Sequence, residues 1–466
     1  MRRATSRHPR VALLLAAMAA ARASLSGHAH AETTAGEPPP PAAAAPTPAP
    51  VPAASPEADE PEAEVEGFTL PAGTEISPPL TLMGYVDFGF ANAGGDGTSF
   101  PAGDNRVPAD YGVDTFATAV NSRGDVASID AMGRVTNGFL PRSVNIGGRP
   151  SFLLNVVNQD LRYQAPNVPV MAFVRIQVLP RWGGDGAGNV TPLFVEQAFG
   201  RVTLIEGREF FVAGGKFDSV FGIEYLENSS VFRTGITPSL FARYTTGTAL
   251  GVKMFFRQQI PALWSAVSIN VAGTNGTNFV EALQPTDASL TGVPVASARL
   301  GYELNLPRVQ FKLGASALRG PRNDQFDREA LMEMYGFDAR LTVAGLSLSG
   351  EYVHVKEEEG AGGKQTGAGE YLIASEFYAK GFWAQAAYAL KLGGPLGAIV
   401  PYARYERRHA AFEGFRPITV ARVTAGLRLE LWAGLILKGE FLFNQELEGA
   451  PTVENNVLTT SVVYAW

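Results

Sequence analysis

The stretch "ARVTAGLRLELWAGLILKGEFLF", residues 421–443, alternates between polar and apolar residues on both sides of a short turn. Before the turn, Arg422, Arg428 and Glu430 share one parity and the apolar residues share the other; Lys438 and Glu440 repeat the pattern after it. A period of two is the period of a β-strand, whose successive side chains point to opposite faces. Each half is longer than the roughly five or six residues of most strands and is long enough to cross lipid at a tilt.

The same alternation recurs from Thr81 to the end of the chain, for example in 174–179, 309–315 and 337–343. Short turns alternate with longer loops between these segments, as in a membrane barrel with tight turns at one rim and long loops at the other. Short turns are expected at 165–169, 205–208, 258–262, 305–308, 343–346 and 431–434, and long loops at 180–192, 219–245, 274–293, 318–333 and 407–416. The pattern predicts an all-β fold, a transmembrane antiparallel up-and-down β-barrel.

The same segments predict the number of strands. Seventeen candidates alternate in polarity, but a barrel whose two ends lie on the short-turn side needs an even number. The candidate strand that makes the number odd lies within 369–391, where "AKG" would form a tight turn on the long-loop rim. We assign 369–378 to a loop and predict sixteen strands. Eighteen is the alternative, with a further strand in the connection 91–150.

Composition limits the classes of function. The chain is 46% hydrophobic and 18% charged, with a net charge of −7 and no cysteine. Its longest strongly apolar run, 11–21, has 11 residues, whereas a spanning helix needs about 20, so a membrane crossing would require a closed barrel. The lack of cysteine excludes disulfide and thiol chemistry, and the negative charge argues against a nucleic-acid partner.

The first 79 residues have a different amino-acid composition. Residues 1–31 are typical of a signal peptide: arginines precede the apolar run, and "AHA" at 29–31 is a small-x-small cleavage site, with "ARA" at 21–23 as the alternative. Residues 32–79 are rich in Pro, Ala and Glu, a composition that cannot bury a core, so we expect a disordered periplasmic linker. The outer-membrane barrel is expected over 80–466.

The last residues, "VLTTSVVYAW" (457–466), place Leu458 and the aromatic residues on one face of a strand. This stretch alone is compatible with two interpretations, an edge strand on a soluble core and the closing strand of a barrel. The ending resembles the C-terminal signature of bacterial outer-membrane barrels, a final aromatic residue preceded by apolar residues at alternate positions. The resemblance implies that Val462, Tyr464 and Trp466 are recognised by the barrel-assembly machinery, and that the protein lies among the lipids of a Gram-negative outer membrane.

Two further stretches resemble porins of the phosphate-selective porin O/P-like superfamily. "GGKFDSVFGIEY" (214–225) is similar to their strand end and following loop, and "VPYARYER" (400–407), with the hairpin after it, is similar to their last strands. The resemblance implies a water-filled channel for passive diffusion of small hydrophilic solutes, and assembly as a homotrimer. It also implies a loop in the first third of the barrel that folds inward and narrows the channel.

The candidate for this loop is 219–245, which is long, mixes aromatic and charged residues, and follows the fifth predicted strand. We expect its charged residues Glu224, Glu227, Arg233 and Arg243 to line the constriction. A plain external loop is the alternative.

The polar parity of the strands predicts the pore lining. A charged Arg or Lys on the lipid face would cost about 2–4 kcal/mol at the midplane, so these residues require a watery interior. The predicted basic residues of the lining are Arg162, Arg175, Arg201, Lys216, Lys253, Arg299, Lys312, Arg340, Arg404, Arg422, Arg428 and Lys438, and the acidic ones are Asp87, Asp160, Glu303, Asp338, Glu351, Glu406, Glu430 and Glu440. The basic excess favours anions; pairing across strands, which would only hold the wall together, is the alternative for each residue.

Two rival functions belong to other classes. A hydrolase would need a nucleophile and a base, but only His354 and His409 follow the signal, and neither has a partner at a diagnostic spacing. A structural or adhesive barrel would have a plugged lumen and no conductance. No metal-binding motif is found, so we expect a diffusion porin with a weak preference for anions, and no enzymatic activity, cofactor or metal.

Overall fold

The computed structural model describes most of the predicted barrel. The described residues are 74–77, 79–93, 151–166, 168–178, 193–205, 209–227, 229–275, 294–323, 327–358, 376–393, 396–412, 417–431, 434–448 and 456–466. All of them belong to the second of two compact units of the chain, Ala58–Trp466. The predicted signal peptide, nearly all of the linker and the connection 94–150 lie outside the described residues.

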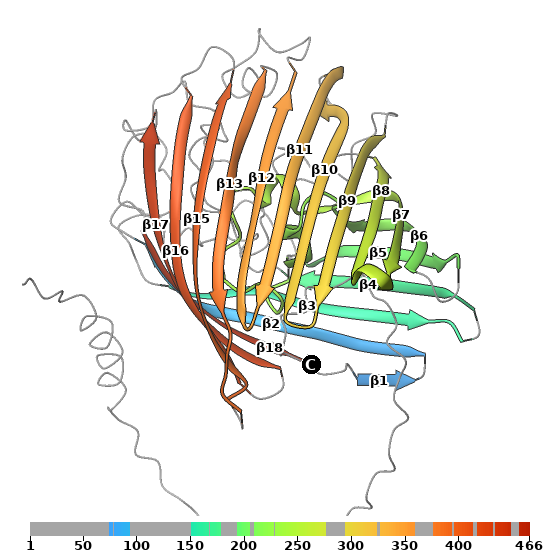
Figure 1. Ribbon diagram of the computed structural model, residues 1–466, viewed down its shortest axis with the longest axis horizontal. Coiled ribbons are helices and arrows are strands. Elements are labelled where there is room, and N and C mark those ends of the chain that lie inside the picture. The colour runs from blue at the N-terminus through green and yellow to red at the C-terminus, as the bar shows by residue number, and fades with distance from the viewer. Residues whose placement is uncertain are drawn as a thin grey trace, which may run out of the picture. The chain divides into compact units, whose positions relative to one another are not determined.

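Eighteen strands form one sheet, and all of them except β1 and β14 build a closed antiparallel barrel of sixteen strands (Figure 1). The strands are β1 (Thr74–Ser77), β2 (Leu80–Ala93), β3 (Ser151–Gln164), β4 (Val170–Val178), β5 (Leu193–Thr203), β6 (Glu209–Asp218), β7 (Thr248–Ile260), β8 (Ser265–Thr274), β9 (Val295–Leu306), β10 (Val309–Asn323), β11 (Asp327–Val343), β12 (Leu346–Glu357), β13 (Phe377–Tyr388), β14 (Leu390–Lys391), β15 (Ala398–Phe412), β16 (Ile418–Glu430), β17 (Leu435–Glu448) and β18 (Val457–Ala465). The predicted sixteen-stranded up-and-down barrel is confirmed.

The barrel closes between its last and first wall strands. β18 pairs antiparallel with β2, from Val457 opposite Ala93 to Ala465 opposite Tyr85. Beyond this ladder, the backbone N–H groups of Gly84 and Trp466 donate to each other's carbonyl oxygens at 3.1 and 3.0 Å. A Cβ atom on Gly84 would lie only 2.8 Å from the Trp466 ring, so glycine allows the terminal indole to pack against this seam.

Figure 1 shows the short β9–β10 and β11–β12 turns at the lower ends of these strands. The β11–β12 turn has two central residues, Ala344 and Gly345, with φ angles of 48° and 87°. Positive φ at both positions defines a type I′ turn, whose twist matches that of the flanking strands.

Two predicted long loops are largely strand. β10 and β11 run through most of 318–333, with Leu318 paired to Met334, and β15 continues to Phe412 within 407–416. These two expectations were wrong because the strands extend further than the alternating apolar segments. The "AKG" sequence is also extended strand, inside β13, so no tight turn falls there.

The barrel has an apolar exterior and a polar interior. Large apolar side chains such as Phe337 and Leu300 are more than half exposed, while Arg408, Arg422 and Arg428 are among the largest fully buried side chains. Within the part of the chain that the structure describes, no helix combines the length and apolar character needed to cross a membrane.

Candidate functional site

The segment between β6 and β7 folds into the barrel as an inner loop, defined here as residues 219–247 (Figure 1, green). It contains the 3-10 helix η3 (Glu224–Glu227) and the short helix α2 (Ala242–Thr245). Nearly all of its described side chains are buried, including those of Ile236 and Leu240. The inner loop makes most of its polar contacts with one side of the wall, strands β15–β17.

Lys438 of β17 is surrounded by backbone carbonyl groups of the inner loop. Its ammonium group donates to the carbonyl oxygens of Ser230 at 2.6 Å, Arg233 at 2.6 Å and Gly235 at 2.9 Å. Arg428 of β16 donates to the same Arg233 carbonyl at 2.9 Å. Hydrogen bonds from charged donors are stronger than neutral ones, so this cluster holds the loop backbone against the wall.

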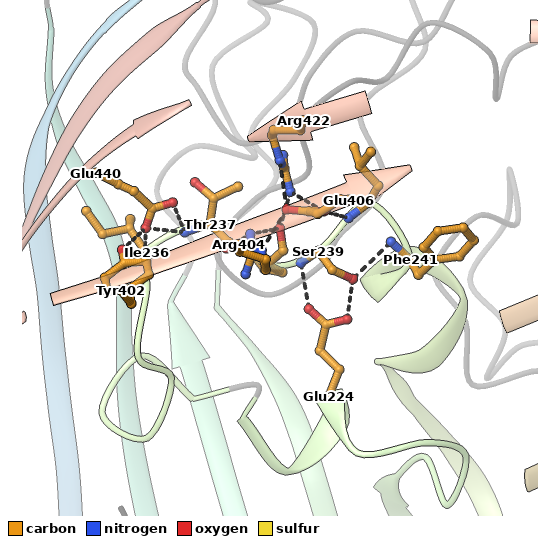
Figure 2. A network of polar contacts seen from close by, with 12 residues as sticks. Glu224, Ile236, Thr237, Ser239, Phe241, Tyr402, Arg404, Glu406, Arg422 and Glu440 are labelled. Carbon is orange, nitrogen blue, oxygen red and sulfur yellow. Dashed lines mark hydrogen bonds and ion pairs between the residues drawn. The ribbon is translucent and has the colours of Figure 1, made fainter. Parts of the chain in front are cut away.

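Glu406 of β15 is the centre of a second cluster (Figure 2). Its carboxylate accepts hydrogen bonds from Arg404 at 2.6 Å and from Arg422 at 3.0 Å. It also accepts one from the backbone N–H of Leu240 at 2.6 Å. Arg404 in turn donates to the carbonyl of Pro238 at 3.0 Å. All three charged side chains are at least 95% buried, so each has exchanged water for partners within the protein.

Glu440 of β17 holds the loop through its backbone amides (Figure 2). The N–H groups of Ile236 and Thr237 donate to its carboxylate, the latter at 3.0 Å, and the Tyr402 hydroxyl donates at 2.8 Å. The inner loop is therefore held by cations on its carbonyls and by carboxylates on its amides. We call the residues that make these contacts the clamp: Tyr402, Arg404, Glu406, Arg422, Arg428, Lys438 and Glu440.

Glu224 holds the loop to itself. Its carboxylate accepts hydrogen bonds from the backbone N–H of Ser239, at 2.6 Å, and from the Ser239 hydroxyl (Figure 2). Burial raises the pKa of the Glu224 carboxyl above its ordinary value, while Arg404 and the hydrogen bonds from Ser239 oppose that rise.

A cavity of about 250 Å³ lies on the other side of the inner loop, against β2–β7. Its walls carry four basic residues, Arg162, Arg175, Arg201 and Lys253, together with Asp160 and Asp218, and several aromatic rings. Arg175 and Asp160 form a two-bond ion pair, with both distances 2.7 Å. The cavity lining therefore has more basic than acidic groups.

The basic groups of this cavity lie over phenyl rings. The Arg201 guanidinium is 5.0 Å from the centre of the Phe211 ring, and the Lys253 ammonium is 5.3 Å from that of Phe217. A cation within about 6 Å of a ring centre is attracted by the ring. Such contacts hold the cations in place without neutralising their charge.

A third group of charges lies around β7–β11, and part of it lines a smaller cavity beside the inner loop: Arg299, Glu303, Lys312, Asp338 and Arg340. Most of them are ion-paired: Arg257 with Glu209 (2.6 Å) and Glu303 (2.7 Å), Arg299 with Asp338 (2.6 Å), and Arg340 with Glu227. Among the described residues, no acidic side chain forms an ion pair or hydrogen bond with the ammonium group of Lys312. The carboxylate of Glu303 is near enough to interact with it electrostatically.

The structure places the predicted basic residues of the pore lining in three groups. Those in the clamp contact the inner loop: Arg404, Arg422, Arg428 and Lys438. Those that line the two cavities are Arg162, Arg175, Arg201, Lys253, Arg299, Lys312 and Arg340. Lys216 alone falls elsewhere: it pairs with outward-facing Leu250. Because Phe211 and Ala213 are buried on the inward face, a period of two turns Lys216 outward.

The predicted constriction residues have different surroundings. Glu224 binds Ser239, Glu227 pairs with Arg340, and the backbone carbonyl of Arg233 is held by the clamp. Arg243 lies in α2, but its side chain is outside the described residues. The predicted assembly residues Val462, Tyr464 and Trp466 lie on the face opposite the buried Val463 and Ala465.

Sequence interpretation missed some inward charges. Arg408 is fully buried and donates to the Tyr244 hydroxyl of the inner loop at 2.9 Å. It has the same parity as Arg404 and Glu406, and extending that strand by two residues would have found it. Arg257 was missed because it lies in the second half of β7, close to the short turn.

The two histidines do not form a catalytic arrangement. His409 makes contacts at 2.9 Å with the Thr419 hydroxyl and 3.3 Å with the Tyr378 hydroxyl, and His354 stacks on Tyr335 with 4.6 Å between ring centres. Within the described part of the chain, no group of three or more His, Cys, Asp or Glu residues is arranged to hold a metal ion.

The chain matches no protein-family model, and no curated protein matches its sequence. Solved structures similar to it include the outer membrane channel DcaP of Acinetobacter baumannii, at 10% identity and a TM-score of 0.48, covering 85% of this chain and 100% of that one. Salmonella typhi OmpF in complex with daunomycin is 9% identical, with a TM-score of 0.47, over 83% and 97% of the two chains. An anion-selective porin from Comamonas acidovorans is 12% identical, with a TM-score of 0.45, over 83% and 99%.

Proposed function

We propose that this protein is an outer-membrane porin, a channel for the passive diffusion of small hydrophilic solutes with a weak preference for anions. The main support is the closed barrel of sixteen strands, apolar outside and charged inside, whose inner loop is held against one wall. A lumen with buried charges and a lipid-compatible exterior is the arrangement that porins use. No step of bond making or breaking is required, and we propose no enzymatic activity.

The path for solutes would follow the side of the lumen that the clamp leaves open, past β2–β11. Both cavities lie on this side, next to Tyr225 and Leu226 of the inner loop. A solute would pass the basic residues around Arg201 and then those around Lys312. Rings of Arg and Lys raise the local concentration of anions, which supports the proposed preference.

The finer assignments are also proposals. Homotrimeric assembly and recognition of the C-terminal strand by the barrel-assembly machinery come from sequence resemblance. The exposed aromatic side chain of Tyr464, on the outer face of β18, is consistent with a lipid-facing closing strand.

The first test is the single-channel current of the purified full-length protein in a planar bilayer, with the reversal potential under a KCl gradient. We expect stable open steps and a reversal potential that favours chloride. A folded barrel without open steps would contradict the channel and favour a structural or adhesive role. A reversal potential that favours potassium would keep the channel and refute the anion preference.

Lys312→Gln tests which residues set the preference. We expect the chloride-to-potassium permeability ratio to fall by roughly fivefold, because a unit charge about 4 Å from an ion contributes about 1 kcal/mol in water, which changes the local concentration of that ion about fivefold. Lys391→Gln is the matched control, because Lys391 is exposed and belongs to β14, outside the barrel wall. An equal change in both variants would mean that only the net charge of the protein matters.

A further inference from the structure

The outer face of the barrel carries a row of polar and aromatic side chains close to the long-loop rim. The strand register places Tyr335, His354, Lys380 and His409 next to one another on β11, β12, β13 and β15. Tyr335 and Lys380 are exposed, and neighbouring positions along these strands, such as Met334, Val353 and Ala379, are buried, so the row points outward.

An aromatic band lies directly below this row. Phe337, Tyr352 and Phe382 are paired across β11, β12 and β13, and Phe337 and Phe382 are exposed. Aromatic girdles on the exterior of membrane barrels lie at the interface between the hydrocarbon core and the lipid headgroups. If the barrel spans a membrane, as proposed above, the polar row therefore lies at the depth of the headgroups.

Two cations at the junction of these rows, Lys380 of the polar row and Arg407 at the level of the aromatic band, have no acidic partner among the described residues. Lys380 and Arg407 are both exposed, and Arg407 pairs in register with Phe382, two positions along β13 from Lys380. Diagonal neighbours of this kind lie roughly 7–8 Å apart. The next row towards the rim is different, because two ion pairs neutralise it: Arg319–Glu333 (3.3 Å) and Lys356–Glu376 (4.0 Å).

The remaining polar groups of this face are already engaged. His409 contacts the Tyr378 and Thr419 hydroxyls, and Glu448 accepts from Thr419 at 3.3 Å at the far end of the row. Glu448 is the one described acid in direct contact with the row, and it lies beyond His409, away from Lys380. The face between β13 and β15 is thus positively charged beside an apolar, aromatic surface.

We propose that Lys380 and Arg407 form a binding site for the phosphate group of an anionic lipid on the outer face of the barrel. An unpaired Arg or Lys is costly inside the hydrocarbon and nearly neutral at the interface, where basic residues attract anionic lipids. The guanidinium of Arg407 can bind two phosphate oxygens at once. Phe382 and Tyr405, both exposed, would contact the upper part of the acyl chains. This apolar surface favours a lipid over a free phosphate ion.

The test uses the full-length protein in detergent micelles, with dioleoylphosphatidic acid as the probe and binding followed by native mass spectrometry. We expect Lys380→Gln/Arg407→Gln to weaken binding of phosphatidic acid by roughly tenfold or more, because each basic residue near an anionic headgroup contributes separately. Dioleoylphosphatidylcholine should bind all variants equally. Arg407→Lys, which keeps the charge, should retain most of the binding.

The matched control is Arg308→Gln/Lys391→Gln, which removes the same charges from exposed positions near the short turns. Equal losses in both double variants, or no loss in either, would overturn the proposal. Displacement of the lipid by excess inorganic phosphate would show a free-anion site and would overturn the lipid as ligand. The single-channel current of each variant is measured in parallel; it should be unchanged, so a failure of the channel proposal remains separate from a failure of this one.

Discussion

The two walls on either side of the inner loop contain the same types of charged residue in different states. On the side of β15–β17, Arg422 and Glu406 are completely buried and bonded to each other and to the loop. On the side of β2–β7, Arg201 and Lys253 line a cavity and lie over aromatic rings. The inner loop makes the difference, because it bonds directly to one wall, whereas a cavity remains between it and the other.

This contrast shows that an inward-facing charge in a barrel is not automatically a pore charge. Four of the predicted pore-lining residues donate to loop carbonyls or to carboxylates of the same wall, Glu406 and Glu430: Arg404, Arg422, Arg428 and Lys438. We infer that they position the loop, whereas the cations of the open side act on passing solutes. The two groups should then respond differently to substitution.

The largest effect is expected from Glu406→Ala in the clamp. The change would leave Arg404 and Arg422 buried beside each other without their shared carboxylate, and removing one partner of a buried pair costs about 3–5 kcal/mol. We expect a lower midpoint of heat unfolding and noisy, larger current steps as the loop loosens. The control is Glu303→Ala on the open side, because Arg257 would keep its ion pair with Glu209 at 2.6 Å. Equal destabilisation in both variants would contradict the distinction between the walls.

A sharper comparison replaces one lysine on each side by methionine, which keeps the length of the chain and removes the charge. Lys438→Met would remove hydrogen bonds to three loop carbonyls, of which that of Arg233 keeps the one from Arg428; a hydrogen bond to a charged group contributes about 1.5–3 kcal/mol. We expect fluctuating conductance with nearly unchanged ion selectivity. Lys253→Met should do the reverse, lowering the chloride preference at steady conductance. Single-channel records of both variants decide the point, and identical phenotypes would refute it.

A smaller effect is expected from Arg201→Gln on the open side. The substitution removes one charge from the cavity lining while Phe211 and the barrel wall remain. We expect the chloride-to-potassium permeability ratio to fall by up to about fivefold, as estimated for a unit charge near the ion path, with no shift in the midpoint of heat unfolding. The reversal potential under a KCl gradient measures the ratio. A large loss of stability would mean that Arg201 is a structural residue like those of the clamp.

The alternation of side chains predicted the barrel and most of its inward charges, because both depend only on strand parity. Lys438 and Arg428 were placed inside by this rule. Their roles could not be predicted, since the carbonyl groups that bind Lys438 come from residues about two hundred positions away, and the path of the inner loop has no periodic signal. Lys216 was placed inside because charged strand residues were assigned to the lumen, although its parity relative to the buried Phe211, Ala213 and Phe217 indicates the outer face.

The smallest effect concerns pH and tests how tightly the inner loop is buried. The pKa of Glu224 is raised above its ordinary value of 4.5, mainly by burial. The ordinary value of 4.5 applies to the unfolded chain, and the raised pKa applies to the folded protein. At a pH between the two, the folded protein holds a proton that the unfolded chain lacks. The contribution of this group to the stability of the fold therefore increases as the pH falls towards 4.5. Glu224→Gln removes that dependence and can keep both contacts with Ser239. We expect the variant to have the higher midpoint of heat unfolding in mildly alkaline buffer, and the difference to shrink as the pH falls. A difference that does not vary with pH would show that water reaches Glu224 and that the loop is looser than the clamp contacts indicate.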